Sequence, residues 1–83
     1  MKMHLLSIMK IVELGFKELK GDKLDNNEYY RWWQIKKNDC ELDITYEFDN
    51  NNKVKNAYLE FNGEQLKGKI ITLADIETLI KLM

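Results

Sequence analysis

The stretch that decides the fold is CELDITYEFD, residues 40–49. Apolar and polar residues alternate through all ten positions, a period of two that is typical of a β-strand with one buried face. Asn38 and Asp39 come directly before it and favour a tight turn. The aromatic and β-branched run over residues 29–36 therefore predicts a second strand that pairs with the first.

Two more strands are expected after this pair. Residues 50–53 form a polar loop, and residues 54–61 follow as the third strand. Asn62 and Gly63 are the strongest short hairpin signal in the chain, because both turn positions need a positive φ. Residues 64–71 then return as a fourth strand.

A helix is predicted on the N-terminal side of the strands, from His4 to Leu14. Its apolar residues recur at helical spacing over a broad arc. Gly15 is well placed as the left-handed residue that ends the helix. Phe16 should then fold back onto Ile11, the apolar contact that accompanies this type of helix end.

A second helix should close the chain. The Thr72 hydroxyl can accept from the amide of Asp75, whose carboxylate also suits a helix N-terminus. Residues 17–27 are polar and predict a loop, with a short edge strand near Leu19. The sequence thus predicts an α+β fold: an N-terminal helix, a four-stranded antiparallel meander and a C-terminal helix, all in one domain over residues 1–83.

Composition limits the function classes. Thirteen basic against fourteen acidic residues give a net charge of −1, so no polybasic or polyacidic tail indicates a partner. The single Cys40 excludes an intramolecular disulfide and a Cys-rich zinc site, and a reducing cytoplasmic setting fits it best. The apolar start is interrupted by Lys10 and Glu13, so we expect neither a signal peptide nor a membrane span.

The turn lengths fix the register, and hence which side chains share a face. A two-residue turn sets Ile35 opposite Leu42, and a four-residue loop sets Ile44 opposite Leu59. The apolar face should receive the helices. The other face combines aromatic and polar side chains, as protein-binding hot spots do. Its candidate binding residues are Tyr30, Trp32, Glu47, Tyr58 and Lys67. Alternatively, a helix covers this face and turns Trp32 and Tyr58 into a second small core.

Catalytic chemistry has little support in the sequence. His4, Ser7 and Cys40 are each the only residue of their type, and no pattern brings them together as nucleophile and base. Asp43 and Glu60 should face each other across the sheet, either as an acid–base or cation-binding pair or as solvated side chains. We therefore expect no enzyme, no catalytic residue, no cofactor and no metal site.

Charge also bears on nucleic-acid binding. Aromatic residues on a sheet can stack bases, yet residues 38–52 contain five acidic and no basic residues, which repel a phosphate backbone. Direct nucleic-acid binding is thus the less favoured alternative. The acidic ladder Glu41, Asp43, Glu47 and Asp49 could instead dock in a basic channel of another protein, or be an ordinary solvated strand face.

Three features together resemble small phage or prophage proteins of AT-rich bacteria such as Bacteroidota. These are the helix ending in Val12-Glu13-Leu14-Gly15-Phe16, the Asn- and Lys-rich meander, and the closing Thr72-Leu73-Ala74-Asp75-Ile76 helix. This resemblance implies a non-enzymatic inhibitor of a host defence effector, of the anti-CRISPR kind, that contacts a bacterial defence protein or ribonucleoprotein. The alternatives are an RNA- or DNA-binding module and a phage structural or assembly protein. Association with further copies of itself stays open.

Overall fold

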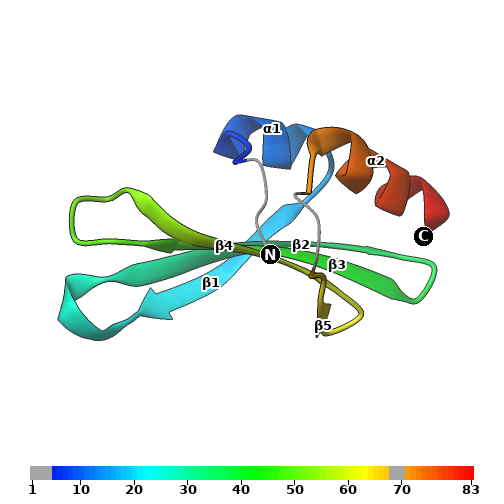
Figure 1. Cartoon of the computed structure of the whole chain (residues 1–83). Coiled ribbons are helices and arrows are strands. Elements are labelled where there is room, and N and C mark those ends of the chain that lie inside the picture. Colours follow the sequence, from blue (N-terminus) through cyan, green and yellow to red (C-terminus); the bar gives the residue numbers. More distant parts are fainter. Residues whose placement is uncertain (1–4, 68–70) are drawn as a thin grey trace.

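The computed structural model describes residues 5–67 and 71–83 of the chain, which form one antiparallel sheet and two helices (Figure 1). In chain order the elements are α1 (Ile8–Glu13), β1 (Lys17–Lys23), the 3-10 turn η1 (Asp25–Asn27), β2 (Tyr29–Lys37), β3 (Cys40–Phe48), β4 (Val54–Phe61), β5 (Glu64–Gln65) and α2 (Leu73–Leu82). The strands follow one another across the sheet in the order β1-β2-β3-β4-β5, so each connection is a simple hairpin. The predicted α+β class is confirmed.

The predicted register between the central strands is also confirmed. Ile35 lies opposite Leu42, and Ile44 lies opposite Leu59. Asn38 and Asp39 both adopt positive φ, as their tight turn requires. A bulge at Lys55 lies close to the β3–β4 loop, because Phe48 pairs with Val54 while Glu47 pairs with Asn56. The bulge restores the expected pairing over the rest of β4.

The edge strand near Leu19 is longer than the sequence predicts. Residues 17–23 pair with β2 instead of forming a loop, which makes β1 a full strand of the sheet. The pairing shifts between Leu19 and Asp22, and Gly21 lies in this bulge. The strand shows no alternation of apolar and polar residues, which is why the sequence did not predict its length. Its charged side chains are typical of an edge strand, where they prevent pairing with other chains.

Arg31 is the charged residue on the otherwise apolar face of β2, and β1 explains its position. Its guanidinium donates two hydrogen bonds of 2.8 Å to the carboxylate of Glu18 on β1. The same group lies 5.3 Å from the centre of the Trp33 ring, a cation–π distance. Through these two contacts Arg31 joins the edge strand to the core.

The N-terminal helix is shorter than predicted, since α1 begins after the cap residue Ser7. His4 lies outside the described residues. The predicted helix end is confirmed: Gly15 has φ +104° and donates to the carbonyl of Val12, while the Phe16 amide donates to the carbonyl of Ile11. This pair of bonds is a Schellman motif. Phe16 and Ile11 are both buried in the core.

The C-terminal helix begins as predicted. The Thr72 hydroxyl accepts from the Asp75 amide, and the Asp75 carboxylate accepts from the Thr72 amide, which completes a capping box. The fourth predicted strand, residues 64–71, is wrong in length, because β5 contains only Glu64 and Gln65. Residues 68–70 of that prediction lie outside the described residues.

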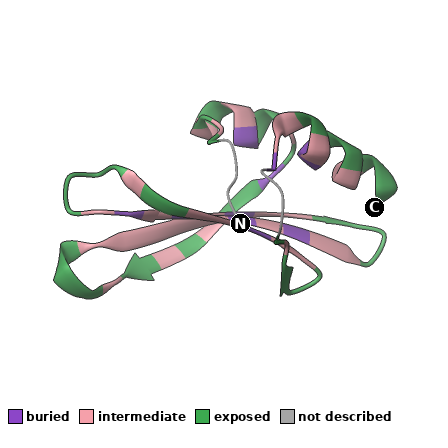
Figure 2. Ribbon diagram, viewed as in Figure 1, coloured by how far each residue is buried: buried purple, intermediate pink, exposed green. Residues whose placement is uncertain are grey.

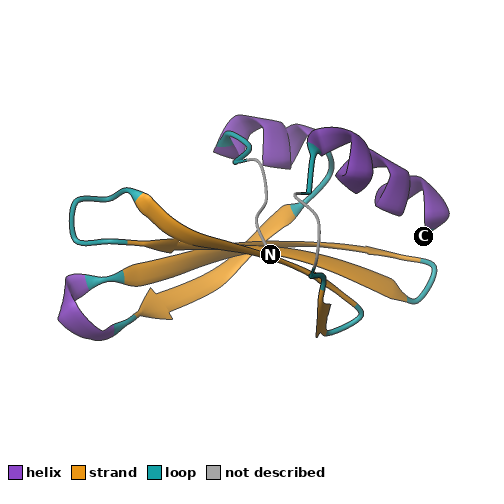
Figure 3. Cartoon of the chain, viewed as in Figure 1, coloured by secondary structure: helices purple, strands orange, loops and turns teal. Residues whose placement is uncertain are grey.

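Both helices lie on the same side of the sheet (Figures 1 and 3). Ile11 of α1 and Ile76 of α2 belong to one hydrophobic cluster with Trp33, Ile44 and Leu59 of the sheet. Along β3 the burial alternates, with Leu42, Ile44, Tyr46 and Phe48 buried and the residues between them half-buried (Figure 2). The core therefore occupies one side of the sheet only.

Candidate functional site

The side of the sheet opposite the helices carries the aromatic and polar residues that the sequence singled out. We call it the open face and define it by the residues of β2, β3 and β4 that point away from the core: Tyr30, Trp32, Gln34, Lys36, Glu41, Asp43, Thr45, Glu47, Asn56, Tyr58 and Glu60. The two described helices pack against the other side (Figure 1). In the described residues, therefore, no helix covers Trp32 and Tyr58.

Trp32 lies in the middle row of this face. It pairs with Thr45 of β3, and Thr45 pairs with Tyr58 of β4, so the two aromatic residues flank a small side chain. From the strand spacing, their backbones are about 9–10 Å apart. The indole N–H of Trp32 donates to the carbonyl of Lys20 at 3.0 Å. Because this donor is satisfied within the chain, Trp32 can offer a partner only the surface of its ring.

Glu47 lies beside this row and is held in place by its neighbours. Its Oε1 accepts from the Tyr58 hydroxyl at 3.1 Å and from the Asn56 side-chain amide at 2.9 Å. Both donors are neutral, so they orient the carboxylate without cancelling its charge. Partial burial and this carboxylate raise the pKa of Tyr58, which keeps its hydroxyl a proton donor.

The other two candidate binding residues are Tyr30 and Lys67, and only Tyr30 lies on the open face. Tyr30 pairs with Glu47 and is half-buried. Lys67 is exposed and lies beyond the last residue of β5, so no strand pairing places it beside Tyr58. The sequence placed Lys67 in the aromatic row only because it predicted a longer fourth strand.

Asp43 of β3 and Glu60 of β4 are paired across the two strands, as the register predicts. Burial raises the pKa of Asp43, and a hydrogen bond from Gln34 partly offsets this effect. The buried Oδ1 of Asp43 has no hydrogen-bond donor within the described part of the chain. Burial therefore disfavours the ionised form of Asp43.

The acidic ladder of β3 is only partly available to a partner. Glu41 forms an ion pair of 3.4 Å with Lys36 of β2. Asp49 closes the β3–β4 loop, where its Oδ1 accepts from the amides of Asn51 and Lys53 at 2.8 and 3.0 Å. These bonds lower the pKa of Asp49. The ladder on the open face is therefore formed by Glu41, Asp43 and Glu47, without Asp49.

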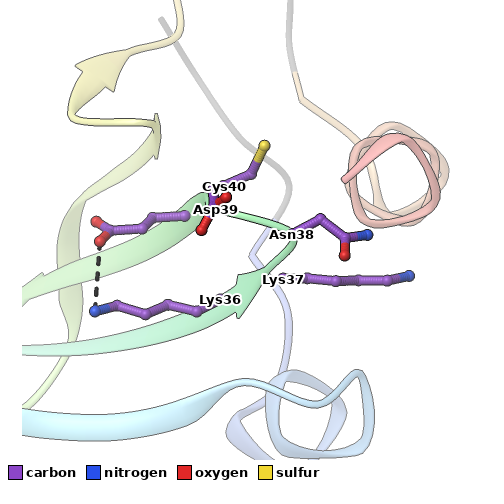
Figure 4. A pocket seen from close by; sticks show the side chains of 6 residues that line it. Lys36, Lys37, Asn38, Asp39 and Cys40 are labelled. Atoms are coloured by element: carbon purple, nitrogen blue, oxygen red, sulfur yellow. Dashed lines mark ion pairs between the residues drawn. The ribbon is translucent and has the colours of Figure 1, made fainter.

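The β2–β3 hairpin carries a pocket beside the only cysteine of the chain. It is lined by consecutive residues, 36–41, and includes the half-buried Cys40 (Figure 4). Figure 4 shows the Cys40 thiol directed away from Lys36 and Lys37. Ser7 is used as the cap of α1, where its hydroxyl accepts from the Lys10 amide. The Ser7 hydroxyl thus serves as a helix cap, and the Cys40 thiol lies in the pocket away from both lysines.

The sequence missed the contribution of β1 to the open face. Lys17, Leu19 and Asp22 pair with Gln34, Trp32 and Tyr30, so they extend the three rows of that face by one strand. Lys20 contributes the carbonyl that fixes the indole of Trp32. The available signal was Leu19, an apolar residue between charged neighbours, which is too little to predict a seven-residue strand.

Three further findings concern metal ions, membranes and similarity to known proteins. Over residues 5–67 and 71–83, no group of three or more His, Cys, Asp or Glu side chains could hold a metal ion. In the same described residues, no helix combines the length and the apolar character needed to cross a membrane. Comparison with protein-family models, curated proteins and solved structures finds no match to this chain.

Proposed function

We propose that this chain is a non-enzymatic binding protein that docks on a partner protein through the open face. The observation that carries the proposal is the row Trp32, Thr45 and Tyr58, which lies opposite the helix-covered core. Tryptophan and tyrosine dominate binding energy at protein interfaces, and polar residues such as Glu47 commonly surround them.

The partner class that we propose is a bacterial defence protein or ribonucleoprotein, bound in the cytoplasm of a phage-infected cell. Its support is the resemblance of the helix ends and the Asn- and Lys-rich meander to small phage proteins. The rigid sheet adds a physical argument, because a preformed surface loses little conformational entropy on binding. In this role the chain inhibits by contact and needs no chemistry of its own.

Direct binding of RNA or DNA is disfavoured by the charges on the same face. Glu47 is oriented beside the aromatic row, and Asp43 and Glu60 lie in the next row. A phosphate backbone that followed the aromatic row would have carboxylates on both sides of it, which repel phosphates.

The test is a plaque assay in bacteria that carry one defined defence system each, with the chain expressed from a plasmid. We expect it to restore phage growth against at least one CRISPR-type effector. Trp32→Ala should remove this effect, because truncating a central interface tryptophan weakens binding about 30- to 1,000-fold. Met9→Ala is the control, since Met9 is 75% exposed on α1, away from the open face.

The thermal midpoint of each variant is measured alongside the plaque assay, because it separates a loss of binding from a loss of folding. A folded Trp32→Ala protein with full inhibition would exclude the open face as the functional surface. Submicromolar binding to single-stranded RNA or DNA, falling steeply with salt, would favour the nucleic-acid-binding module. No restored growth with any defence system would contradict the anti-defence role.

A further inference from the structure

The open face has a charge balance unlike that of the chain as a whole. The paired strand positions on this face contain more than twice as many carboxylates as amines. The carboxylates belong to Asp22, Glu41, Asp43, Glu47 and Glu60, and the amines to Lys17 and Lys36. In the full sequence, by contrast, fourteen acidic residues almost balance thirteen basic ones.

The negative charge is uneven across the face. Lys36 forms an ion pair with Glu41. The excess of acids lies in the row of Glu47, which also holds Asp22, and in the row of Asp43, where Asp43 and Glu60 accompany a single Lys17. These two rows lie on either side of the aromatic row of Trp32 and Tyr58. A partner group that reaches the aromatic rings therefore lies between carboxylates as well.

Glu28 and, after it, Glu47 raise the pKa of Lys55, but the Lys55 ammonium contacts Glu28 and not Glu47. Lys55 lies in the bulge of β4, and its ammonium donates to the carboxylate of Glu28. The two groups that contact the Glu47 carboxylate, the Tyr58 hydroxyl and the Asn56 amide, are neutral and both bind Oε1. Glu47 thus presents a fixed, charged carboxylate next to an aromatic ring.

Aromatic rings beside carboxylates are complementary to one kind of side chain above all. A guanidinium group stacks on aromatic rings through its flat face and binds carboxylates through its N–H groups. Trp32 suits this mode because its own donor is used by Lys20, which leaves the ring as its contact surface. A lysine ammonium would gain the charge attraction but not the stacking.

We propose that the partner inserts a basic, arginine-bearing segment on the open face, with an arginine over the Trp32–Tyr58 row and its guanidinium on Glu47. This inference rests on the proposed function, because it specifies the chemistry of the partner at the same surface. It commits to a protein segment. A second copy of this chain is an alternative that the experiment below distinguishes, and the measurement of single-stranded RNA and DNA binding described above tests a nucleic acid.

The experiment is an NMR titration of the ¹⁵N-labelled full chain with four blocked ten-residue peptides. In these peptides threonine alternates with arginine, lysine, glutamine or glutamate. We expect the arginine peptide to shift the indole signal of Trp32 and the amides of Thr45, Glu47 and Tyr58. It should bind at least about fivefold more tightly than the lysine peptide, and raising the salt concentration should weaken it.

Two variants test the assigned carboxylate. Glu47→Gln keeps the shape of the side chain and its ability to accept from Tyr58, so it should fold and bind the arginine peptide about tenfold more weakly. Glu77→Gln removes the same charge from the exposed side of α2 and should leave binding unchanged. Should Glu47→Gln fail to fold, Glu60→Gln makes the same test in the row on the other side of Trp32 and Tyr58, with a smaller loss expected.

The outcomes separate this inference from the proposed function. If the glutamine or glutamate peptide shifts the same residues equally well, the face binds proteins but not through arginine, and only this inference fails. If no peptide shifts the open face, or the line widths show that copies of the chain pair through it, this inference also fails. The proposed function fails on other results: a folded and fully inhibitory Trp32→Ala protein, or no restored growth with any defence system.

Discussion

The hydroxyl group of Tyr46 forms two hydrogen bonds to the backbone of Leu6. It accepts from the Leu6 amide at 2.8 Å and donates to the Leu6 carbonyl at 2.9 Å. Tyr46 is a core residue of β3, whereas Leu6 belongs to the segment that leads into α1. The pair therefore holds the N-terminal helix against the central strand, and burial raises the pKa of Tyr46 so that its hydroxyl remains protonated.

Tyr46→Phe should lower the free energy of unfolding by about 1–3 kcal/mol. The substitution leaves both backbone groups of Leu6 without their partner in a partly buried place, and such groups are costly to leave unpaired. Urea denaturation measures the change. The control is Tyr30→Phe on the open face, which we expect to change stability by less than about 0.5 kcal/mol. Equal losses in the two variants would contradict a special role for the Tyr46 hydroxyl.

Ile44→Ala should lower the free energy of unfolding by roughly 2–4 kcal/mol, because Ile44 is fully buried at the centre of the sheet. A domain of this size has little stability to lose, so much of the population should unfold. Denaturant titrations measure the effect, and the exposed Val12→Ala serves as the control. A loss below about 1 kcal/mol for Ile44→Ala would show that the core is elsewhere.

Gly21→Ala should destabilise the edge strand more than Gly63→Ala destabilises its turn. A Cβ atom at residue 21 would lie 2.1 Å from the backbone carbonyl oxygen of Tyr30, which must move or lose its pairing. At Gly63 the added atom meets nothing within 4 Å, and only its φ of +85° opposes the change. Thermal melts and hydrogen exchange of the β1 amides measure the difference. Equal effects would mean that β1 is not held at this bulge.

Asp43→Asn should stabilise the protein near neutral pH and have little effect in acid. Because burial raises the pKa of Asp43 in the folded state, folding favours its protonated form. The stability that this group contributes is complete below the unfolded pKa of about 4 and is lost as the pH rises through the folded pKa. An asparagine side chain does not ionise in this pH range, so the variant does not lose this stability as the pH rises.

The difference in unfolding free energy between Asp43→Asn and the natural chain should therefore grow from about pH 3 upward and then level off. Measuring the difference cancels the opposite contribution of Glu18, whose pKa Arg31 lowers. Asp25→Asn, at the exposed 3-10 turn, is the matched control. A pH-independent difference for Asp43→Asn would show that this carboxyl is not buried against Gln34 and Glu60.

The candidate site shows which signals in a sequence are reliable. The pairing of Trp32 with Thr45 and of Thr45 with Tyr58 was predictable, because turn length and the period of two leave one register that keeps the apolar residues together. The position of Lys67 was not predictable, because it depended on the length of the last strand, in which apolar and polar residues do not alternate clearly. The hydrogen bonds that fix Glu47 and Trp32 depend on side-chain rotamers and on β1, which no local pattern specifies.

By itself, then, the sequence determined the α+β class, the helix ends at Gly15 and Thr72, and the two faces of the meander. These features depend on local interactions: backbone conformation, capping groups and alternation along a strand. Only the tertiary structure decided that both helices pack on the Ile44 side and that residues 17–23 complete the sheet. Either side of a sheet can receive a helix, and a charged edge strand forms only when its neighbour offers backbone groups and a partner such as Arg31. The open face exists because packing of the whole chain placed its two helices together.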